Sequence, residues 1–261
     1  MKKRKLVKVD GNLMGTFIAD SISISDAIER SSRIDRALKK GIHETFKVLS
    51  EDEALAMDGY TRMFVGLLYA GGDDALFIIP SWMAIPISLY IAYWFWRELG
   101  GARQLSVGIA SGKTKHNIWA LLESANYMLN EVCKVKFKHE LVKGDVNTIK
   151  DIVAVISYAF SEQQNLLPTL VENIMEHPLS SQPYIIKYGE SLKNNLNDFE
   201  ELITLIPGYK ESKSLEDKLK NFIRLSHEVF SLLKGDNSHG IADLRDVLYE
   251  IHRVASRYGD V

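Results

Sequence analysis

The sequence contains a single cysteine among its 261 residues, and proline interrupts its one long uncharged run. One thiol, Cys133, excludes a disulfide framework and a zinc site of several thiolates, and we expect a reducing, cytoplasmic compartment. The uncharged stretch from Ala75 to Trp96 is long enough to cross a bilayer, but Pro80 and Pro86 divide it into a strand and a helix. We therefore expect no membrane span.

An excess of either charge is lacking too, because 32 basic residues oppose 34 acidic ones and the formal net charge is -2. The overall field gives no attraction to nucleic acid, so contact with RNA or DNA must come from local patches. The sequence also has no Walker lysine motif, no dinucleotide glycine fingerprint and no nucleophile elbow. Apolar residues make up 46% of the chain, enough for the core of one large or two smaller domains.

Residues 1–143 alternate between patterns of period two and period 3.6, which predicts a sheet with helices packed on it. Lys5 to Asp10 predicts the first strand, and Ser25 is placed to cap a long amphipathic helix. A helix over 85–99 and a strand over 105–110 come later in this half. They precede a helix with the predicted inward positions Ile118, Leu122, Ala125, Leu129 and Val132.

Two apolar runs, Tyr60 to Tyr69 and Ala75 to Ile79, flank Gly71-Gly72-Asp73-Asp74 and predict a β-hairpin. The resulting order β-α-β-β-α-β-α resembles a ferredoxin-like palm, an α+β fold with an antiparallel sheet and helices on one side. Residues 144–261 show helical spacing without a convincing strand, which predicts an all-α helical bundle domain. Their apolar repeats include Leu192, Leu196, Phe199 and Ile203, then Leu215, Leu219, Phe222 and Val229, then Ile241, Leu244, Leu248 and Ile251.

Three carboxylates are predicted at one end of this sheet. Asp10 ends the first strand, while Asp73 and Asp74 lie at the tip of the hairpin. Metal-assisted phosphoryl transfer needs acidic residues held close on rigid backbone, and Mg²⁺ prefers such oxygen ligands. Glycine and aspartate also form ordinary turns, so each motif alone has a purely structural interpretation. Their predicted coincidence favours a catalytic, metal-binding role.

Seven further residues are candidates for nucleotide binding. Two turn glycines allow backbone to approach a ligand, a glycine-containing loop could aim amides at phosphates, and two lysines could contact a triphosphate. These residues are Gly71 and Gly72 in the turn, Gly11, Asn12 and Gly15 in the loop, and Lys113 and Lys115 after the strand at 105–110.

With these residues in place, the chain resembles the large polymerase and cyclase-like subunit of type III CRISPR effector complexes. The resemblance covers about residues 5 to 135. It rests on Val9-Asp10-Gly11-Asn12-Leu13-Met14-Gly15, Arg30-Ser31-Ser32-Arg33-Ile34-Asp35, Ala37-Leu38-Lys39-Lys40, Tyr69-Ala70-Gly71-Gly72-Asp73-Asp74 and Ser106-Val107-Gly108-Ile109-Ala110.

The resemblance implies synthesis of cyclic oligoadenylate from ATP in antiviral defence, with Mg²⁺ or Mn²⁺ at the carboxylates of Asp10, Asp73 and Asp74. It also implies partner subunits, a CRISPR RNA, a target RNA and a second palm. The family's usual subunit is longer, and its His-Asp nuclease motif and cysteine-rich zinc element have no counterpart in this sequence. A single palm fits either a separate piece of a larger subunit or a chain that pairs with itself.

Two other functions remain open from the sequence. The chain could be a catalytically silent scaffold that organises RNA and protein subunits, or a cyclic dinucleotide synthase that uses GTP. Metal-dependent ATP binding discriminates the enzyme from the scaffold, and nucleotide preference discriminates the two enzymes.

Overall fold

One mixed sheet organises the part of the chain that the computed structural model describes, which is residues 3–51, 66–80, 83–113, 117–143, 150–160, 183–187, 216–217, 219–224 and 226. The strand order is β2-β3-β1-β4-β5-β6. The strands are β1 (Lys3–Gly11), β2 (Leu67–Gly71), β3 (Asp74–Pro80), β4 (Leu105–Lys113), β5 (Ile152–Phe160) and β6 (Tyr184–Lys187).

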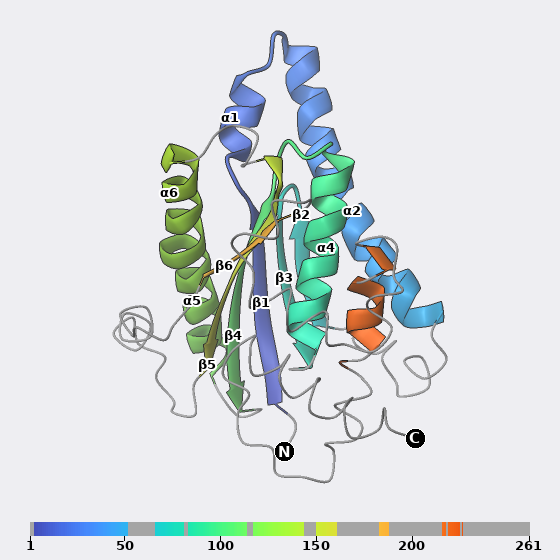
Figure 1. Cartoon of the computed structure of the whole chain (residues 1–261), viewed down its shortest axis with the longest axis vertical. Coiled ribbons are helices and arrows are strands. Elements are labelled where there is room, and N and C mark those ends of the chain that lie inside the picture. Colours follow the sequence, from blue (N-terminus) through green and yellow to red (C-terminus); the bar gives the residue numbers. More distant parts are fainter. Residues whose placement is uncertain are drawn as a thin grey trace.

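Helices cover both faces of this sheet, with α2 and α4 on one side and α5 and α6 on the other (Figure 1). The expectation of helices on one side only was therefore wrong, while the order from β1 to α6 confirms the predicted α+β palm. The helices are α1 (Met14–Ala19), α2 (Ile24–Glu51), α4 (Ala84–Glu98), α5 (Ile118–Tyr127), the π-helical η3 (Met128–Lys134) and α6 (Val135–Lys143).

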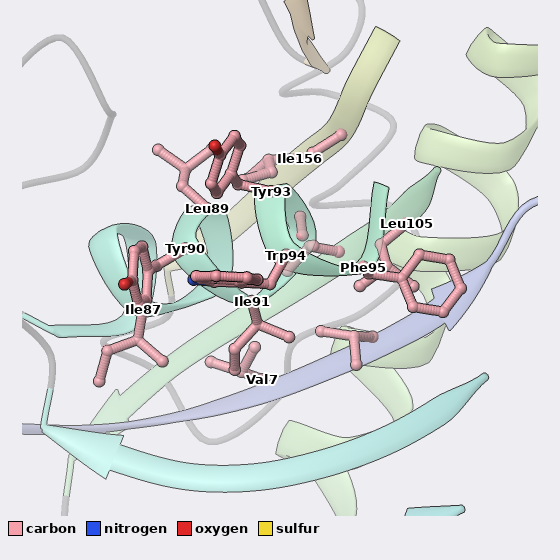
Figure 2. Close-up of a cluster of buried hydrophobic side chains, with 14 of the residues drawn as sticks. Val7, Ile87, Leu89, Tyr90, Ile91, Tyr93, Trp94, Phe95, Leu105 and Ile156 are labelled. Atoms are coloured by element: carbon pink, nitrogen blue, oxygen red, sulfur yellow. The ribbon is translucent and has the colours of Figure 1, made fainter. Parts of the chain in front are cut away.

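The main core lies between α4 and the sheet. Figure 2 shows Tyr90, Trp94 and Phe95 of α4 packed over strand residues that include Val7 and Leu105. The helix is apolar around most of its circumference, which is the pattern of a buried helix. None of the helices in the described part of the chain has both the length and the apolar character that crossing a bilayer requires.

The sheet continues beyond residue 143, which the sequence did not lead us to expect. β5 pairs in parallel with β4, and β6 pairs antiparallel with β5. The expectations of a purely antiparallel sheet and of no strand after 144 were therefore wrong. Helical residues at 219–224 bury Leu219 and Phe222 in the main core, in agreement with the predicted helix there. The remainder of the predicted helical bundle lies outside the described residues.

Helix α2 begins two residues earlier than predicted. Ser23 rather than Ser25 caps it, because the Ser23 hydroxyl accepts a hydrogen bond from the Asp26 amide at 3.1 Å. The Asp26 carboxylate reaches back to the Ile22 amide at 3.0 Å, which satisfies a second amide before the first helical turn. The helix predicted from residue 25 is otherwise confirmed as far as Glu51.

The helix after β4 changes pitch in the middle. Residues 128–134 form a π-helical stretch between α5 and α6, and this rotates the residues that follow relative to a regular helix. Ala125, Leu129 and Val132 are buried as predicted, but Ile118 is 43% exposed. The interpretation of Ile118 as an inward position was therefore wrong.

Candidate metal and nucleotide site

The end of β1 and the tip of the β2–β3 hairpin meet, as the sequence predicts. β1 and β3 are antiparallel with Val9 opposite Ala75, so Asp10 follows in β1 beside the start of β3 at Asp74. Gly71 pairs with Asp74, which leaves Gly72 and Asp73 as the two turn residues. Gly72 adopts φ 61°, a conformation that glycine takes without steric strain and that suits this kind of tight hairpin.

Asp73 folds back from the turn onto the end of β1. Its Oδ2 atom accepts a hydrogen bond from the Gly11 amide at 3.2 Å. A Cβ atom on Gly11 would lie only 2.8 Å from this oxygen and 2.6 Å from Cγ of Met14. Glycine at position 11 therefore allows the close approach of the Asp73 carboxyl group, and a side chain there would displace Asp73 or Met14.

The Asp73 and Asp10 carboxyl groups lie side by side. Burial raises the pKa of Asp73 to about 6, and both hydrogen bonding to Asp10 and repulsion from its charge add to the rise. The amides of Asp73 and Gly11 act in the opposite direction and lower this pKa. Two carboxyl groups this close form a pair of oxygen donors of the kind that Mg²⁺ or Mn²⁺ binds.

Two lysines form ion pairs with the carboxylates of Asp10 and Asp74. Lys134 from η3 pairs with Asp10, and Lys8 from β1 pairs with Asp74. The side chains of Asp10 and Lys134 are 23% and 27% exposed, so solvent and small ions can reach this pair. Within the described ranges, no group of three or more His, Cys, Asp or Glu side chains is arranged to hold a metal ion. A metal bound by all three aspartates thus requires the lysines to move away.

The turn is also attached to helix α2. The Gly72 amide donates to Oδ1 of Asp35 at 3.1 Å, and Asp35 also pairs with Lys39 one helical turn later. The hydrogen bond from Lys39 lowers the pKa of Asp35, with a smaller contribution from the Gly72 amide, so the carboxylate stays ionised as an acceptor. Asp35 therefore fixes the tip of the hairpin against the helix layer.

The predicted glycine-containing loop is a turn followed by the short helix α1. Asn12 is buried, its amide donates to the Gln104 carbonyl at 2.9 Å, and its Oδ1 atom accepts from Ser106 at 2.7 Å. Its Nδ2 atom has no hydrogen-bond partner among the described residues. Gly15 lies within α1, where a Cβ atom would meet no neighbour within 4 Å. The Gly11 and Asn12 amides are thus already engaged with protein oxygens.

Lys113 lies at the opposite end of the sheet from the carboxylates. Asp10 is opposite Ser106 in β4, whereas Lys113 is opposite Lys3. The seven residues from Ser106 to Lys113 span about 23 Å of strand, because a strand rises about 3.3 Å per residue. The prediction that Lys113 contacts a phosphate held beside Asp10 was therefore wrong. Lys115 lies outside the described residues.

Sequence reasoning did not identify Lys8, Lys134 or Asp35 as part of this site. Lys8 could have been predicted, because residues two apart on a strand share a face and Lys8 lies two residues before Asp10. Asp35 was noted only within the motif 30–35 that carries the family resemblance. Lys134 reaches Asp10 from the π-helical stretch, and a regular helical period gives no indication of that contact.

A family model matches the chain over residues 5–143, and its description is Cas10/Cmr2, second palm domain. The matched segment runs from within β1 to the end of α6 and includes all three aspartates. A search of curated proteins found no match.

Several crystal structures of a Csm1-Csm4 cassette show a limited similarity to the chain. The complex with cA4 is 15% identical with a TM-score of 0.45, and the match covers 97% of this chain and 36% of that one. The complex with pppApApA is 17% identical with a TM-score of 0.45, covering 91% and 30%. The complex with AMPPNP is 14% identical with a TM-score of 0.42, covering 96% and 36%. The chain thus spans about a third of the length of the chains it matches.

Proposed function

The chain belongs to the Cas10/Cmr2 family through its second palm domain, and from this premise we propose that it synthesises cyclic oligoadenylate from ATP in a type III CRISPR effector complex. The observation that carries the proposal is the contact between the carboxyl groups of Asp10, at the end of β1, and Asp73, in the β2–β3 turn, which meet at one end of the sheet. Asp74 adjoins this pair at the start of β3.

Asp10, Asp73 and Asp74 would hold Mg²⁺ or Mn²⁺. Bound there, the ions would supply the charge that activates a ribose hydroxyl and stabilises the reacting α-phosphate of ATP. The chain's own residues prepare the site. Asp35 and the Gly72 turn hold the hairpin tip in place, and Gly11 orients the Asp73 carboxyl group through its amide. Gly72, where a Cβ atom would meet no neighbour within 4 Å, leaves the backbone open for a nucleotide, and Tyr69 covers Gly71 with a hydrogen bond of 3.3 Å to its carbonyl.

Joining two nucleotides requires a second nucleotide site. We propose that a second palm, either in a partner subunit or in a second copy of this chain, supplies it. The remaining partners in this proposal are the other effector subunits, a CRISPR RNA and a target RNA, all in the cytoplasm.

The test is conversion of labelled ATP with Mn²⁺ by the chain assembled with its partner subunits and target RNA. We expect oligoadenylate from the wild type, none from Asp73→Ala, and unchanged product from the control Glu29→Ala, an exposed acid on α2. Product formation that survives Asp73→Ala overturns the proposal. A parallel reaction with GTP tests the cyclic dinucleotide alternative, which only a GTP-derived product would support.

A second candidate function is a silent scaffold in the same complex. The observation that favours it is the occupation of Asp10 and Asp74 by the ammonium groups of Lys134 and Lys8. Calorimetric titration of the wild type with ATP and Mn²⁺ decides between the two. Binding that depends on the metal supports the enzyme, whereas its absence together with absent product supports the scaffold.

A further inference from the structure

A pair of arginines shares one aromatic ring near the end of the sheet that carries the carboxylates. The guanidinium carbon of Arg103 lies 4.9 Å from the centre of the Phe17 ring, and that of Arg30 lies 5.2 Å from it. Phe17 belongs to α1, Arg30 to α2, and Arg103 to the segment just before β4. Three separate segments therefore bring two positive charges together over one side chain.

The two guanidinium groups differ in how they are neutralised. Arg30 pairs with Asp26 at 3.0 Å and donates to the Phe17 carbonyl at 2.8 Å. Arg103 donates to the carbonyl of its neighbour Ala102 at 2.7 Å, but its Nε atom is buried without a hydrogen-bond partner. In the described part of the chain no carboxylate forms an ion pair with Arg103. A partly buried cation without a counter-ion is unfavourable unless something else binds it.

The charges around Arg103 are mixed. Burial lowers the pKa of its guanidinium and the charge of Arg30 adds to this, while the charge of Asp20 acts in the opposite direction. Arg33, on the same helix as Arg30, donates to the Glu98 carbonyl at 3.2 Å. The nearby acids Asp20 and Asp26 thus offset part of the positive charge, and Asp26 is already taken by Arg30.

The arginine pair lies at the same end of the sheet as the aspartates. Gly11 is opposite Leu105 in β4, and the Asn12 amide binds the carbonyl of Gln104, the residue next to Arg103. Along the strand direction Arg103 is therefore about 10 Å from the level of Asp10. The buried Nδ2 atom of Asn12 is a second donor without a partner in this region.

We propose that Arg103, supported by Arg30 and Phe17, binds a phosphate group of the nucleotide or oligonucleotide that reaches the Asp10–Asp73 pair. Arginine presents a planar set of donors that matches phosphate oxygens, and the aromatic ring holds the guanidinium plane in place. The identity of the ligand as a nucleotide rests on the proposed function, whereas the presence of an anion site does not.

The proposal is tested by titrating the full chain with sodium tripolyphosphate, and separately with a linear triadenylate, in EDTA. We expect Arg103→Ala to weaken binding by roughly tenfold to a hundredfold, because it removes charge-assisted hydrogen bonds. Arg103→Lys keeps the charge but not the paired donors, so a smaller loss is expected. The control Arg36→Ala removes an exposed arginine of α2 and should leave binding unchanged.

The two probes identify the source of the phosphate. Tighter binding of tripolyphosphate indicates the triphosphate of a substrate, and tighter binding of triadenylate indicates the phosphodiester backbone of a growing chain. Equal binding by Arg103→Ala, Arg103→Lys and Arg36→Ala, or no binding of either probe by the wild type, overturns the proposal. Arg103→Lys decides the matter if Arg103→Ala does not fold.

Failure of the proposed function gives a different result. An Asp73→Asn variant that makes no oligoadenylate but binds tripolyphosphate as the wild type does in EDTA leaves the anion site standing. Product formed at the wild-type rate by Arg103→Ala, with binding in EDTA unchanged, removes the anion site and leaves the cyclase proposal standing.

Discussion

The two faces of β1 are covered by different helices and carry different chemistry. Val7 and Val9 point to the side of α4 and belong to the main core. Lys8 and Asp10 alternate with them and meet charged partners, Asp74 from β3 and Lys134 from η3. From Val7 to Asp10, alternation along the strand therefore places core residues and site residues one position apart on opposite faces. Further back, Leu6 on the face of Lys8 belongs to a second apolar cluster.

The first way to break this comparison is to remove a large side chain from the apolar face. Phe95 on α4 is fully buried, and Phe95→Ala should lower the free energy of unfolding by about 3–5 kcal/mol. On the other face, Lys8→Met removes one partner of a half-buried ion pair, whose side chains are 17% and 32% exposed, and should lower the free energy of unfolding by a smaller amount, about 1–3 kcal/mol. Urea denaturation of both variants measures the difference. Similar losses of unfolding free energy in the two variants would show that the two faces contribute equally to stability.

A smaller effect is expected from pH on the charged face. The pKa of Asp73 is about 6 in the folded protein, above its ordinary value of 3.8. Between these values the folded state holds a proton that the unfolded chain has released, so the stability from this group is lost as pH rises from about 4 to 6. We expect the urea midpoint of the metal-free wild type to fall between about pH 4 and pH 6 when it is measured against that of Asp73→Asn.

The same measurement has an internal control. Asn at position 73 cannot ionise, so the pH dependence of the Asp73→Asn variant reports all the other groups. Parallel pH profiles for the two proteins would contradict the raised pKa of Asp73. Added Mg²⁺ should reduce the loss above pH 6 in the wild type only, because a cation replaces the proton between the carboxylates.

The smallest expected effect is on metal affinity when Lys134, the partner of Asp10, is replaced. Lys134→Met removes an ammonium group that competes with a metal ion for Asp10, so Mn²⁺ should bind roughly twofold to fivefold more tightly. Lys136→Met is the matched control, because the side chain of Lys136 is 42% exposed and pairs with Glu140 on α6 instead. Electron paramagnetic resonance of free Mn²⁺ gives both affinities. Weaker binding by Lys134→Met would mean that Lys134 supports the metal site rather than competing for it.

The hairpin and its aspartates were predictable because their signals are local. Gly72 and Asp73 form a two-residue turn between two apolar runs, and turn chemistry specifies that arrangement with little help from the rest of the fold. The position of Asp10 followed from the strand that precedes it. The placement of Lys113 failed for a topological reason, since β4 runs antiparallel to β1 and ends at the other end of the sheet.

Two other features depend on contacts that a local pattern does not contain. The run Ile152–Phe160 has the continuous apolar, β-branched character of a strand buried on both faces, a pattern shared with buried helices over short lengths. Only its parallel pairing with β4 identifies it as part of the sheet. The contact between Lys134 and Asp10 depends on the π-helical stretch, which tertiary packing rather than helical period selects.

The parallel strand β5 has a practical consequence for anyone who isolates the palm as a fragment. A fragment that ends at residue 143, the limit of the family match, lacks β5, the strand that pairs with Leu105–Ser111 of β4. The backbone amides and carbonyls of β4 on that side are then unpaired, and such an apolar edge strand can pair with another molecule. A fragment that keeps residues 150–160 retains its own cover for that edge.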